Sequence, residues 1–389
     1  MNINDKKIGI VGGGQLGKMM ILEAKRLGFY VAVLDPSPDC PAHSICDLHI
    51  VGDLNDPQGY KELSKRVDVI TYEWENISVK VLEKLEKDGY PVYHPIKTLK
   101  KIQNKYSQNE VLQKNNIPVP NFKKVKNIDE IKEAGKPENF GYPLMLKTTT
   151  GGYDGKGTAL IKTKSDVEDA FRQLGSGAVE LMVEEFVDFE KEISLIACRN
   201  TKGDKVMYPI AENTHVNSIL DTTIVPAGIN KSISDKVYII GDKLMGALEF
   251  IGTFCIEMFV SKTGDVLVNE IAPRPHNSGH YTIEACFANQ FENHIRAITG
   301  LPLGDVNLKT PAVMINLIGQ SDGVAKLEGL EEAYNHPNVH IHLYGKKVSK
   351  KERKMGHYTV VNEDLSKAKD LAYKLKNVIS VGATTLGHT

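Results

Sequence analysis

Apolar and polar positions alternate between two patterns over the first hundred residues. Short apolar runs typical of buried strands occur at Ile8–Val11, Val31–Asp35, Val67–Tyr72 and Pro91–Tyr93. Segments with helical spacing lie between them, at Gln15–Leu27, Pro57–Ser64 and Ser78–Asp88. Strands that alternate with helices predict a parallel, doubly wound sheet, which binds ligands beyond the carboxyl ends of its strands.

The pattern changes after about residue 105. A polar helix is expected at 106–115, followed by the proline-containing connector "NNIPVPNF". Paired strand-like runs follow, at 142–147, 158–163, 181–186, 192–199, 253–260 and 265–271. Helical patterns interrupt them at 165–174 and 233–248. This mixture predicts an α+β domain that is distinct from the first one.

A smaller α/β pattern begins near Leu301. Its strands are expected at Ala312–Ile318, Val339–Tyr344 and His357–Val361, and its helix at Asp364–Leu375. The chain is therefore predicted to mix α/β and α+β architecture in three domains. These are a Rossmann-like N-terminal domain at 1–105, a central domain at 106–300 and a small C-terminal α/β domain at 301–389.

Charge and cysteine usage limit the classes of partner and compartment. The 389 residues include 48 Lys and Arg against 49 Asp and Glu, so the net charge is -1 and there is no global positive field to attract nucleic acid. No long apolar segment suggests a signal peptide or a membrane span. The cysteines form no C-x-x-C pair, which favours a reduced, cytoplasmic setting. They are Cys40, Cys46, Cys198, Cys255 and Cys286.

The stretch "IGIVGGGQLGKMM" carries Gly12, Gly14 and Gly17 in the spacing G-x-G-x-x-G between a strand and a helix. Free N–H groups at the start of such a helix bind an anion. Asp35 could accept from the ribose of NAD, but it leads into a proline-rich turn. The spacing therefore favours a phosphate-bearing ligand over NAD.

A second glycine-rich loop joins two strand-like segments in "LKTTTGGYDGKGT". Its glycines are more numerous than a hairpin turn requires, and lysines lie beside them. The loop lacks the Walker A pattern and is predicted to fold over a polyphosphate. The residues concerned are Lys147, Gly151, Gly152, Gly155, Lys156 and Gly157.

Two glutamates are expected to meet across a hairpin. A turn centred on Thr263-Gly264 places Glu257 opposite Glu270, with Cβ atoms about 4.5–5.5 Å apart. Like charges facing each other in apolar strands are destabilising unless a cation lies between them, and Mg²⁺ with nucleotide phosphates suits that position. Asn269 could add an oxygen only by reaching round the strand. A solvated strand face, or a register slip of one residue, would remove the argument.

Other polar residues leave alternatives open. Glu184, Glu185 and Glu192 could accept from a ribose or an adenine amine, or could be solvated, and His215 is a weaker candidate. A basic segment near the C-terminus could be plain surface, a nucleic-acid patch or a site for a phosphorylated small molecule. It contains Lys346, Lys347, Lys350, Lys351, Arg353 and Lys354.

Five segments in this order carry a family resemblance: "GGGQLGKM", "YEWEN", "GGYDGKG", "NEIAPRPHNSGH" and "RKMGH". Together they resemble the N5-carboxyaminoimidazole ribonucleotide synthase family of the ATP-grasp superfamily. The resemblance implies an ATP-grasp fold and a ligase that uses ATP and bicarbonate. Through carboxyphosphate it would carboxylate 5-aminoimidazole ribonucleotide in de novo purine biosynthesis. It also implies Mg²⁺ and a cytoplasmic homodimer that binds small molecules and neither nucleic acid nor membrane.

The same resemblance implies roles for individual residues. ATP would be bound by Lys105, Lys147, Gly151, Gly152, Tyr153, Asp154, Gly155, Lys156, Gly157, Glu184, Glu185, Phe186, Val187, Glu192, His215, Asn269 and Glu270, and Mg²⁺ by Glu257 and Glu270. The ribonucleotide would face Gln15, Leu16, Glu73, Asn76, Lys346, Arg353 and Lys354. Tyr153, Asp154, Arg274 and His276 would surround the reacting groups. Lys105 stands where the family pattern leads us to expect Arg.

Rival functions remain at this point. A formate-dependent glycinamide ribonucleotide transformylase shares the acyl-phosphate chemistry. A biotin-dependent carboxylase is disfavoured because no M-K-M-like segment is present. An NAD oxidoreductase and an ATP-binding regulatory module without catalysis are the alternatives outside the ligases.

Overall fold

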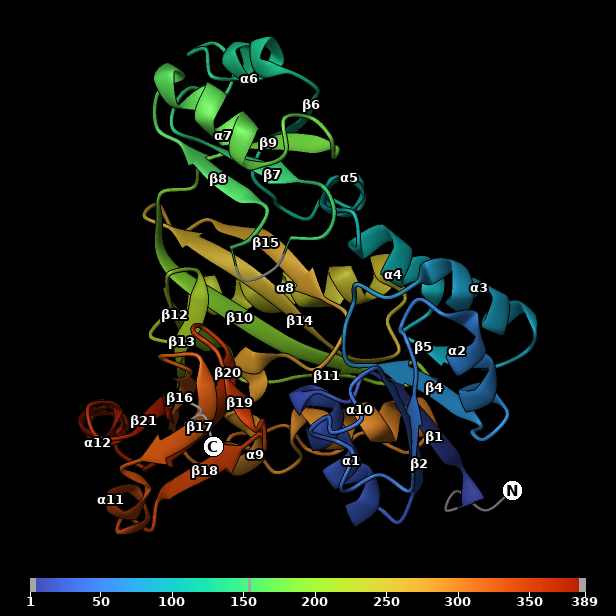
Figure 1. Cartoon of the computed structure of the whole chain (residues 1–389). Helices are drawn as coiled ribbons and strands as arrows, with labels where there is room; N and C mark the ends of the chain where they lie inside the picture. The colour runs from blue at the N-terminus through green and yellow to red at the C-terminus, as the bar shows by residue number, and fades with distance from the viewer. Residues whose placement is uncertain (1–4, 153–154, 385–389) are drawn as a thin grey trace.

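The computed structural model describes residues 5–152 and 155–384 of the chain (Figure 1). Tyr153 and Asp154, which were expected near the reacting groups, lie outside the described residues. Among the residues that are described, no helix combines the length and apolarity needed to cross a membrane.

The N-terminal unit is built on a parallel sheet with the strand order β3-β2-β1-β4-β5, as expected. Its strands are β1 (Lys7–Val11), β2 (Tyr30–Asp35), β3 (Leu48–Val51), β4 (Val69–Tyr72) and β5 (Val92–Tyr93), and its helices are α1 (Gln15–Arg26), α2 (Pro57–Ser64), α3 (Val79–Lys87) and α4 (Ile96–Ile102). The sequence pattern missed β3 and α4. Because the strand order reverses between β1 and β4, the loops after these two strands form the crevice where such sheets bind ligands.

A smaller sheet with the order β6-β9-β7-β8 forms a lobe above the rest of the molecule (Figure 1). The antiparallel pair β7–β8 flanks the second glycine-rich loop, as predicted. The elements of this region are α5 (Lys105–Lys114), β6 (Phe122–Val125), α6 (Ile128–Ala134), β7 (Leu144–Thr148), β8 (Thr158–Ile161), the 3-10 helix η2 (Lys164–Asp166), α7 (Val167–Gln173) and β9 (Leu181–Glu185).

The largest sheet has the order β15-β14-β10-β12-β13-β16-β20-β18, with β11 paired to β10. Its strands are β10 (Phe189–Arg199), β11 (Lys205–Met207), β12 (Ala211–Val216), β13 (Ile219–Val225), β14 (Gly252–Ser261), β15 (Val266–Ala272), β16 (Ala312–Ile318), β18 (Val339–Leu343) and β20 (Lys354–Val361). The β13–β16 pairing carries the sheet from the central region into residues 301–389. The expected domain boundaries stay predictions, but the C-terminal region is joined to the central one by strand pairing.

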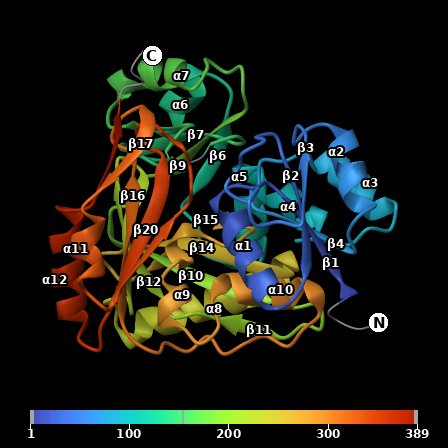
Figure 2. The same cartoon turned by 60° about the horizontal axis from the view of Figure 1, so that its bottom comes forward.

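The remaining elements lie around this sheet, and three of them form a separate three-stranded sheet (Figure 2). They are α8 (Lys231–Leu248), η3 (Asn277–Gly279), α9 (Thr282–Ala285), α10 (Gln290–Thr299), β17 (Gly323–Glu328), α11 (Leu330–Tyr334), β19 (Val348–Ser349), α12 (Leu365–Lys376) and β21 (Ser380–Thr384). Helix α8 packs Val237 and Leu244 into the core over β10 and β14. Helix α10 packs Phe291 and Ile295 against α1, so it joins the N-terminal unit to the largest sheet.

Two buried histidines hold this junction. The His94 Nε2 lies 2.9 Å from the carbonyl oxygen of Thr253, and the Thr253 N–H donates to His294 Nδ1 at 3.1 Å. The Thr71 hydroxyl lies 2.9 Å from His294 Nε2. Burial lowers the pKa of His94 to about 3 and that of His294 well below its ordinary value. Both rings are therefore neutral in the folded protein at neutral pH.

These histidines predict that stability decreases in mild acid. The unfolded chain takes up protons on them near pH 6.5 while the folded chain does not, so their contribution is complete above that pH. As pH falls further, each should reduce the free energy of unfolding by about 1.4 kcal/mol per pH unit. Urea unfolding between about pH 7.5 and about pH 5.5 measures this slope. His294→Gln, which loses the titrating ring, should show a shallower slope, and equal slopes would contradict the prediction.

Candidate active site

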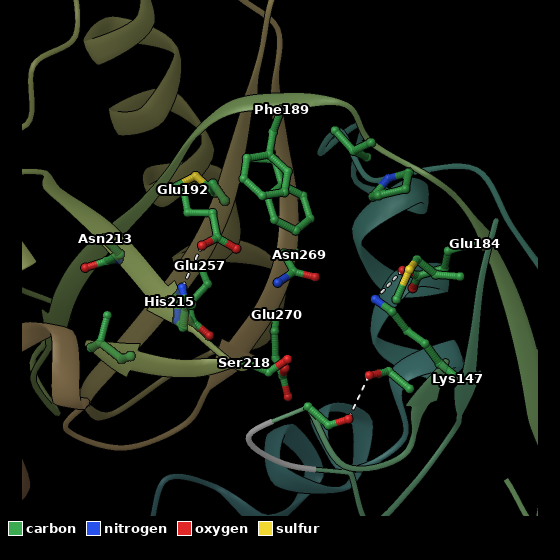
Figure 3. Close-up of a pocket in the computed structure, with 18 of the residues that line it drawn as sticks. Lys147, Glu184, Phe189, Glu192, Asn213, His215, Ser218, Glu257, Asn269 and Glu270 are labelled. Carbon is green, nitrogen blue, oxygen red and sulfur yellow. Dashed lines mark hydrogen bonds and ion pairs between the residues drawn. The ribbon is translucent and has the colours of Figure 1, made fainter. Parts of the chain in front are cut away.

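A cavity of about 460 Å³ lies between the upper lobe and the largest sheet (Figure 3). Most of the residues expected around ATP line it. From the predicted set these are Lys105, Lys147, Gly155, Glu184, Glu185, Phe186, Val187, Glu192, His215, Glu257, Asn269, Glu270, His276 and Lys354. Segments far apart in the sequence thus converge on one pocket of the size that small-molecule ligands occupy.

The sequence analysis missed the apolar wall of this cavity. The rings of Phe189 and Phe259 stack with centroids 4.7 Å apart and planes inclined by 11°. Met145 and Met258 line the same space. The sequence did contain a signal for this wall: Phe259 is two residues from Glu257 in the same strand, so their side chains share a face. A flat apolar wall of this kind can pack against a planar base.

Across the cavity, Glu184 and Lys147 form a buried ion pair (Figure 3). The other oxygen of Glu184 accepts from Asn109 Nδ2 at 3.0 Å. Glu184 therefore anchors Lys147, which keeps a cation at the lobe side of the cavity. Glu185 likewise uses its carboxylate locally, because Asn121 Nδ2 donates to it at 2.7 Å.

Glu192 and His215 form the pair on the opposite wall. The Glu192 Oε2 lies 2.6 Å from His215 Nδ1. Burial works against a charged ring, but the hydrogen bond to Glu192 and the charge of Glu257 raise the pKa of His215. The raised pKa favours the protonated, cationic form of His215, the weakest candidate in the sequence, beside the cavity.

The predicted glutamate pair is confirmed, because Glu257 is directly opposite Glu270 in the β14–β15 ladder. The symmetric turn used to predict it was wrong. Nearer the turn, Met258 faces Val268, and a β-bulge at Asn269 restores the register of the two glutamates. The bulge also re-aims Asn269 into the cavity beside them. Asn269 does not have to reach round the strand.

The two facing carboxylates have different electrostatic surroundings. Burial raises the pKa of Glu257 to about 7; the charge of His215 opposes this rise, and Glu270 adds to it. Burial acts the same way on Glu270, but Lys105 outweighs it and lowers the pKa of that carboxyl. The Lys105 Nζ lies 2.7 Å from Glu270 Oε1. Lys105 keeps the positive charge expected there without the planar fork of an arginine.

This arrangement fits Mg²⁺ accompanied by phosphate. Burial and the negative charge of Glu270 both disfavour the ionised form of Glu257, and a divalent cation would offset both effects. The amide oxygen of Asn269 is beside Glu257 in the cavity. Within residues 5–152 and 155–384, no three His, Cys, Asp or Glu side chains converge as a metal cage. Mg²⁺ suits such a site because it is commonly held by one or two carboxylates together with phosphate and water oxygens.

Arg274 and His276 follow β15 and lie next to this pair. The Arg274 guanidinium is held by Glu75 of the N-terminal unit, with Nη2 3.1 Å from Oε1 and a second bond from Nε. His276 Nε2 is 4.0 Å from Glu257 Oε1. Burial and the positive charges of Arg274 and Lys354 hold the pKa of His276 well below its ordinary value. His276 is therefore a neutral imidazole at the cavity.

The first glycine loop binds carboxylates of the chain itself. The N–H groups of Gly14 and Gly17 donate to Glu73, the latter at 2.6 Å. The Gly13 N–H donates to Asp35 at 2.7 Å. A Cβ at Gly14 would lie 2.5 Å from Glu73 Oε1, so this close approach requires glycine. The glycine spacing is thus explained without a bound nucleotide.

The other residues expected at the ribonucleotide are distributed around this loop. Gln15 begins α1, and the side chain of Leu16 is buried in the core. Asn76 is exposed after β4. Because the same segment holds Glu73 and Glu75, both carboxylates lie at the crevice beside the reversal of strand order.

Two lysines of the basic segment near the C-terminus, Lys354 and Lys346, have different surroundings. Lys354 lines the cavity beside His276. Lys346 donates to the carbonyl oxygen of Lys354 at 2.7 Å, and burial together with Arg353 and Lys354 lowers the pKa of Lys346 to about 8. The charge of Glu73 acts on Lys346 in the opposite sense. Lys346 therefore belongs to the region between the glycine loop and the cavity.

Three family models match successive parts of the chain. The ribonucleotide synthetase preATP-grasp domain matches residues 5–103, the ATP-grasp domain matches 110–291, and the phosphoribosylaminoimidazole carboxylase C-terminal domain matches 312–371.

Whole-length relatives agree with this result. N5-carboxyaminoimidazole ribonucleotide synthase of Staphylococcus aureus (strain COL) is 41% identical over 379 residues, which cover 96% of this chain and 98% of the relative. The crystal structure of N5-carboxyaminoimidazole ribonucleotide synthetase from Thermotoga maritima matches with a TM-score of 0.88 and 46% identity, covering 97% of this chain and 100% of that one. An Aspergillus clavatus enzyme, in complex with ADP and 5-aminoimidazole ribonucleotide, matches with a TM-score of 0.88 and 32% identity, covering 96% and 98%. The chain belongs to the N5-carboxyaminoimidazole ribonucleotide synthase family and has its ATP-grasp fold.

Proposed function

We propose that this chain binds MgATP in the cavity and uses it with bicarbonate to carboxylate 5-aminoimidazole ribonucleotide through carboxyphosphate. Its family makes it an ATP-dependent ligase of purine biosynthesis. The observation that carries the proposal is the facing pair Glu257 and Glu270 in a cavity that has an apolar wall. The homodimer and the cytoplasmic location implied by the family resemblance remain predictions.

The nucleotide would lie with its base against the apolar wall made by Phe189 and Phe259. Lys147 and His215 supply positive charge from opposite walls, which favours a polyphosphate between them. Glu257, Glu270 and Asn269 would hold Mg²⁺. When bound, Mg²⁺ neutralises charge on the phosphate oxygens and thereby favours phosphoryl transfer.

The residues next to the glutamate pair are suited to the second step of the reaction, the carboxylation of the ribonucleotide. Neutral His276 and cationic Lys354 line the end of the cavity next to Glu257. Lys346 and Arg353 would bind the 5′-phosphate of the ribonucleotide near the crevice of the N-terminal sheet. In this order, nucleotide, one-carbon oxyanion and amine substrate would lie in a row across the domain junction.

The second glycine loop is suited to exclude water from a labile acyl phosphate. Gly155 and Thr158 line the cavity. A Cβ on Gly155 would overlap the side chain of Ser218 on the opposite wall, so the loop approaches that wall closely. Closing a cavity in this way protects a reactive intermediate from hydrolysis.

The proposal predicts which substrates support turnover. Phosphate release from MgATP should require both bicarbonate and 5-aminoimidazole ribonucleotide for the full rate. Formate with glycinamide ribonucleotide should not replace them, and NAD should neither bind nor turn over. A coupled phosphate assay with each substrate omitted in turn measures this. Turnover that is indifferent to the ribonucleotide would remove the assignment.

Glu270→Gln tests the carboxylate pair. The change keeps the size of the side chain but removes the charge opposite Glu257, so kcat should fall by roughly 100- to 1000-fold. The matched control is Glu212→Gln on β12, whose carboxylate is paired with Lys191. The control should keep turnover near that of the unmodified protein. Near-normal kcat in Glu270→Gln, with an unchanged melting temperature, would refute the role in metal binding.

A further inference from the structure

The ion pair between Glu75 and Arg274 joins the N-terminal unit to the active site. Glu75 follows β4, and Arg274 follows β15. The guanidinium donates from Nε to one carboxylate oxygen and from Nη2 to the other. The side chains are only 18% and 13% exposed, respectively. Planar, two-point pairing of this kind fixes the direction of an arginine as well as its charge.

The loop that carries Glu75 is itself fixed in place. Gln103, at the end of α4, donates from Nε2 to the carbonyl oxygens of Glu75 at 2.6 Å and Ile77 at 2.9 Å. Two residues before Glu75, the carboxylate of Glu73 holds the first glycine loop. Glu75 is therefore a rigid support, anchored on both sides, and not a mobile surface residue.

Arg274 has competing carboxylates within electrostatic reach. Its charge lowers the pKa of Glu270, and Glu73 contributes to the raised pKa of Arg274. The edge of the guanidinium that carries Nε and Nη2 forms a fork with one carboxylate at a time. Without Glu75, that edge would be open to the other carboxylates that act on Arg274, namely Glu73 and Glu270, and we assign Glu270 to Mg²⁺.

The fork leaves part of the guanidinium available. Among the described residues, its contacts are to Glu75 and, from Nη1 at 3.3 Å, to the carbonyl oxygen of Pro275. N–H groups therefore remain on the terminal nitrogens next to His276, which lines the cavity.

We propose that Glu75 is a positioning residue that directs Arg274 toward the oxygens of the transferred phosphoryl group and keeps it off Glu257 and Glu270. This inference rests on the proposed function, because it assigns Glu75 to that same reaction. It places a determinant of phosphoryl transfer on the N-terminal unit, outside the ATP-grasp region that binds the nucleotide. Glu75 acts only through Arg274.

Glu75→Gln tests the assignment. Gln keeps the length of the side chain but offers a single oxygen to the fork, so kcat should fall by roughly 10- to 100-fold through loss of alignment. The KM for ATP should stay within about twofold, because the apolar wall of the cavity and Lys147 are unaffected. The control is Glu23→Gln, since Glu23 also binds across the junction, accepting from Asn289 at 2.6 Å. It should leave both constants unchanged.

A double-mutant cycle with Arg274→Lys separates positioning from simple structural support. If Glu75 acts through Arg274, the double variant should be no slower than Arg274→Lys alone. Additive losses, or equal kcat in Glu75→Gln and the unmodified protein, would overturn the inference. If Glu75→Gln does not fold, Glu75→Asp serves in the same cycle, with the charge kept and the reach shortened.

Failure of the proposed function would look different. The unmodified protein would then show no phosphate release that depends on bicarbonate and the ribonucleotide, whatever the variants do. When the unmodified protein shows that dependence, the behaviour of Glu75→Gln reports on the positioning role alone.

Discussion

Two like charges held face to face in a partly buried hairpin are the constraint on which the site depends. At about 5 Å and an effective dielectric constant of about 20, a pair of carboxylates repels by roughly 3 kcal/mol. This repulsion is offset by the ion pair between Lys105 and Glu270 and by the charge of His215 near Glu257. The other residues of the cavity surround the two glutamates, where a bound cation would relieve this repulsion.

The arrangement of sheets explains how three regions of the chain reach one site. The upper lobe contributes Lys147 from β7, and the largest sheet contributes the glutamate pair. Strand pairing between β13 and β16 carries that sheet into the C-terminal region, so Lys354 at the start of β20 also lines the cavity. The N-terminal unit reaches the site through the fork between Glu75 and Arg274. Each region supplies charge from a strand or from the segment next to one, where backbone geometry holds the side chain in place.

Local patterns in the sequence were sufficient for the parallel sheet. They predicted the right glutamate pair only because the bulge at Asn269 compensates for a turn whose register is displaced by one residue from the expected one. Strands β12 and β13 went unpredicted because polar residues interrupt their apolar pattern. The partners of Glu184 could not be predicted, since Asn109 lies on a helix far away in the sequence. The fork between Glu75 and Arg274, 199 residues apart, is likewise a product of tertiary structure.

The glycine fingerprint shows why spacing alone is a weak guide to ligand identity. The exposed N–H groups at the start of α1 need a negative partner, and any carboxylate that the fold delivers can satisfy them. Here Glu73, 56 residues beyond Gly17, provides it. The same geometry that binds a pyrophosphate in a dinucleotide enzyme thus fixes the relative position of two strand ends. In this chain it places the loop carrying Glu75 beside the cavity.

The ion pairs within the cavity influence which ligand the cavity binds. Lys105, Lys147 and His215 are each paired with a carboxylate, namely Glu270, Glu184 and Glu192. A bare anion that enters meets positive charges that are already compensated, and it also meets Glu257. A polyphosphate that brings its own divalent cation offers negative charge to the lysines and positive charge to the glutamates together. Balanced pairs therefore favour a metal–nucleotide complex over free phosphate, although the cavity is rich in cationic groups.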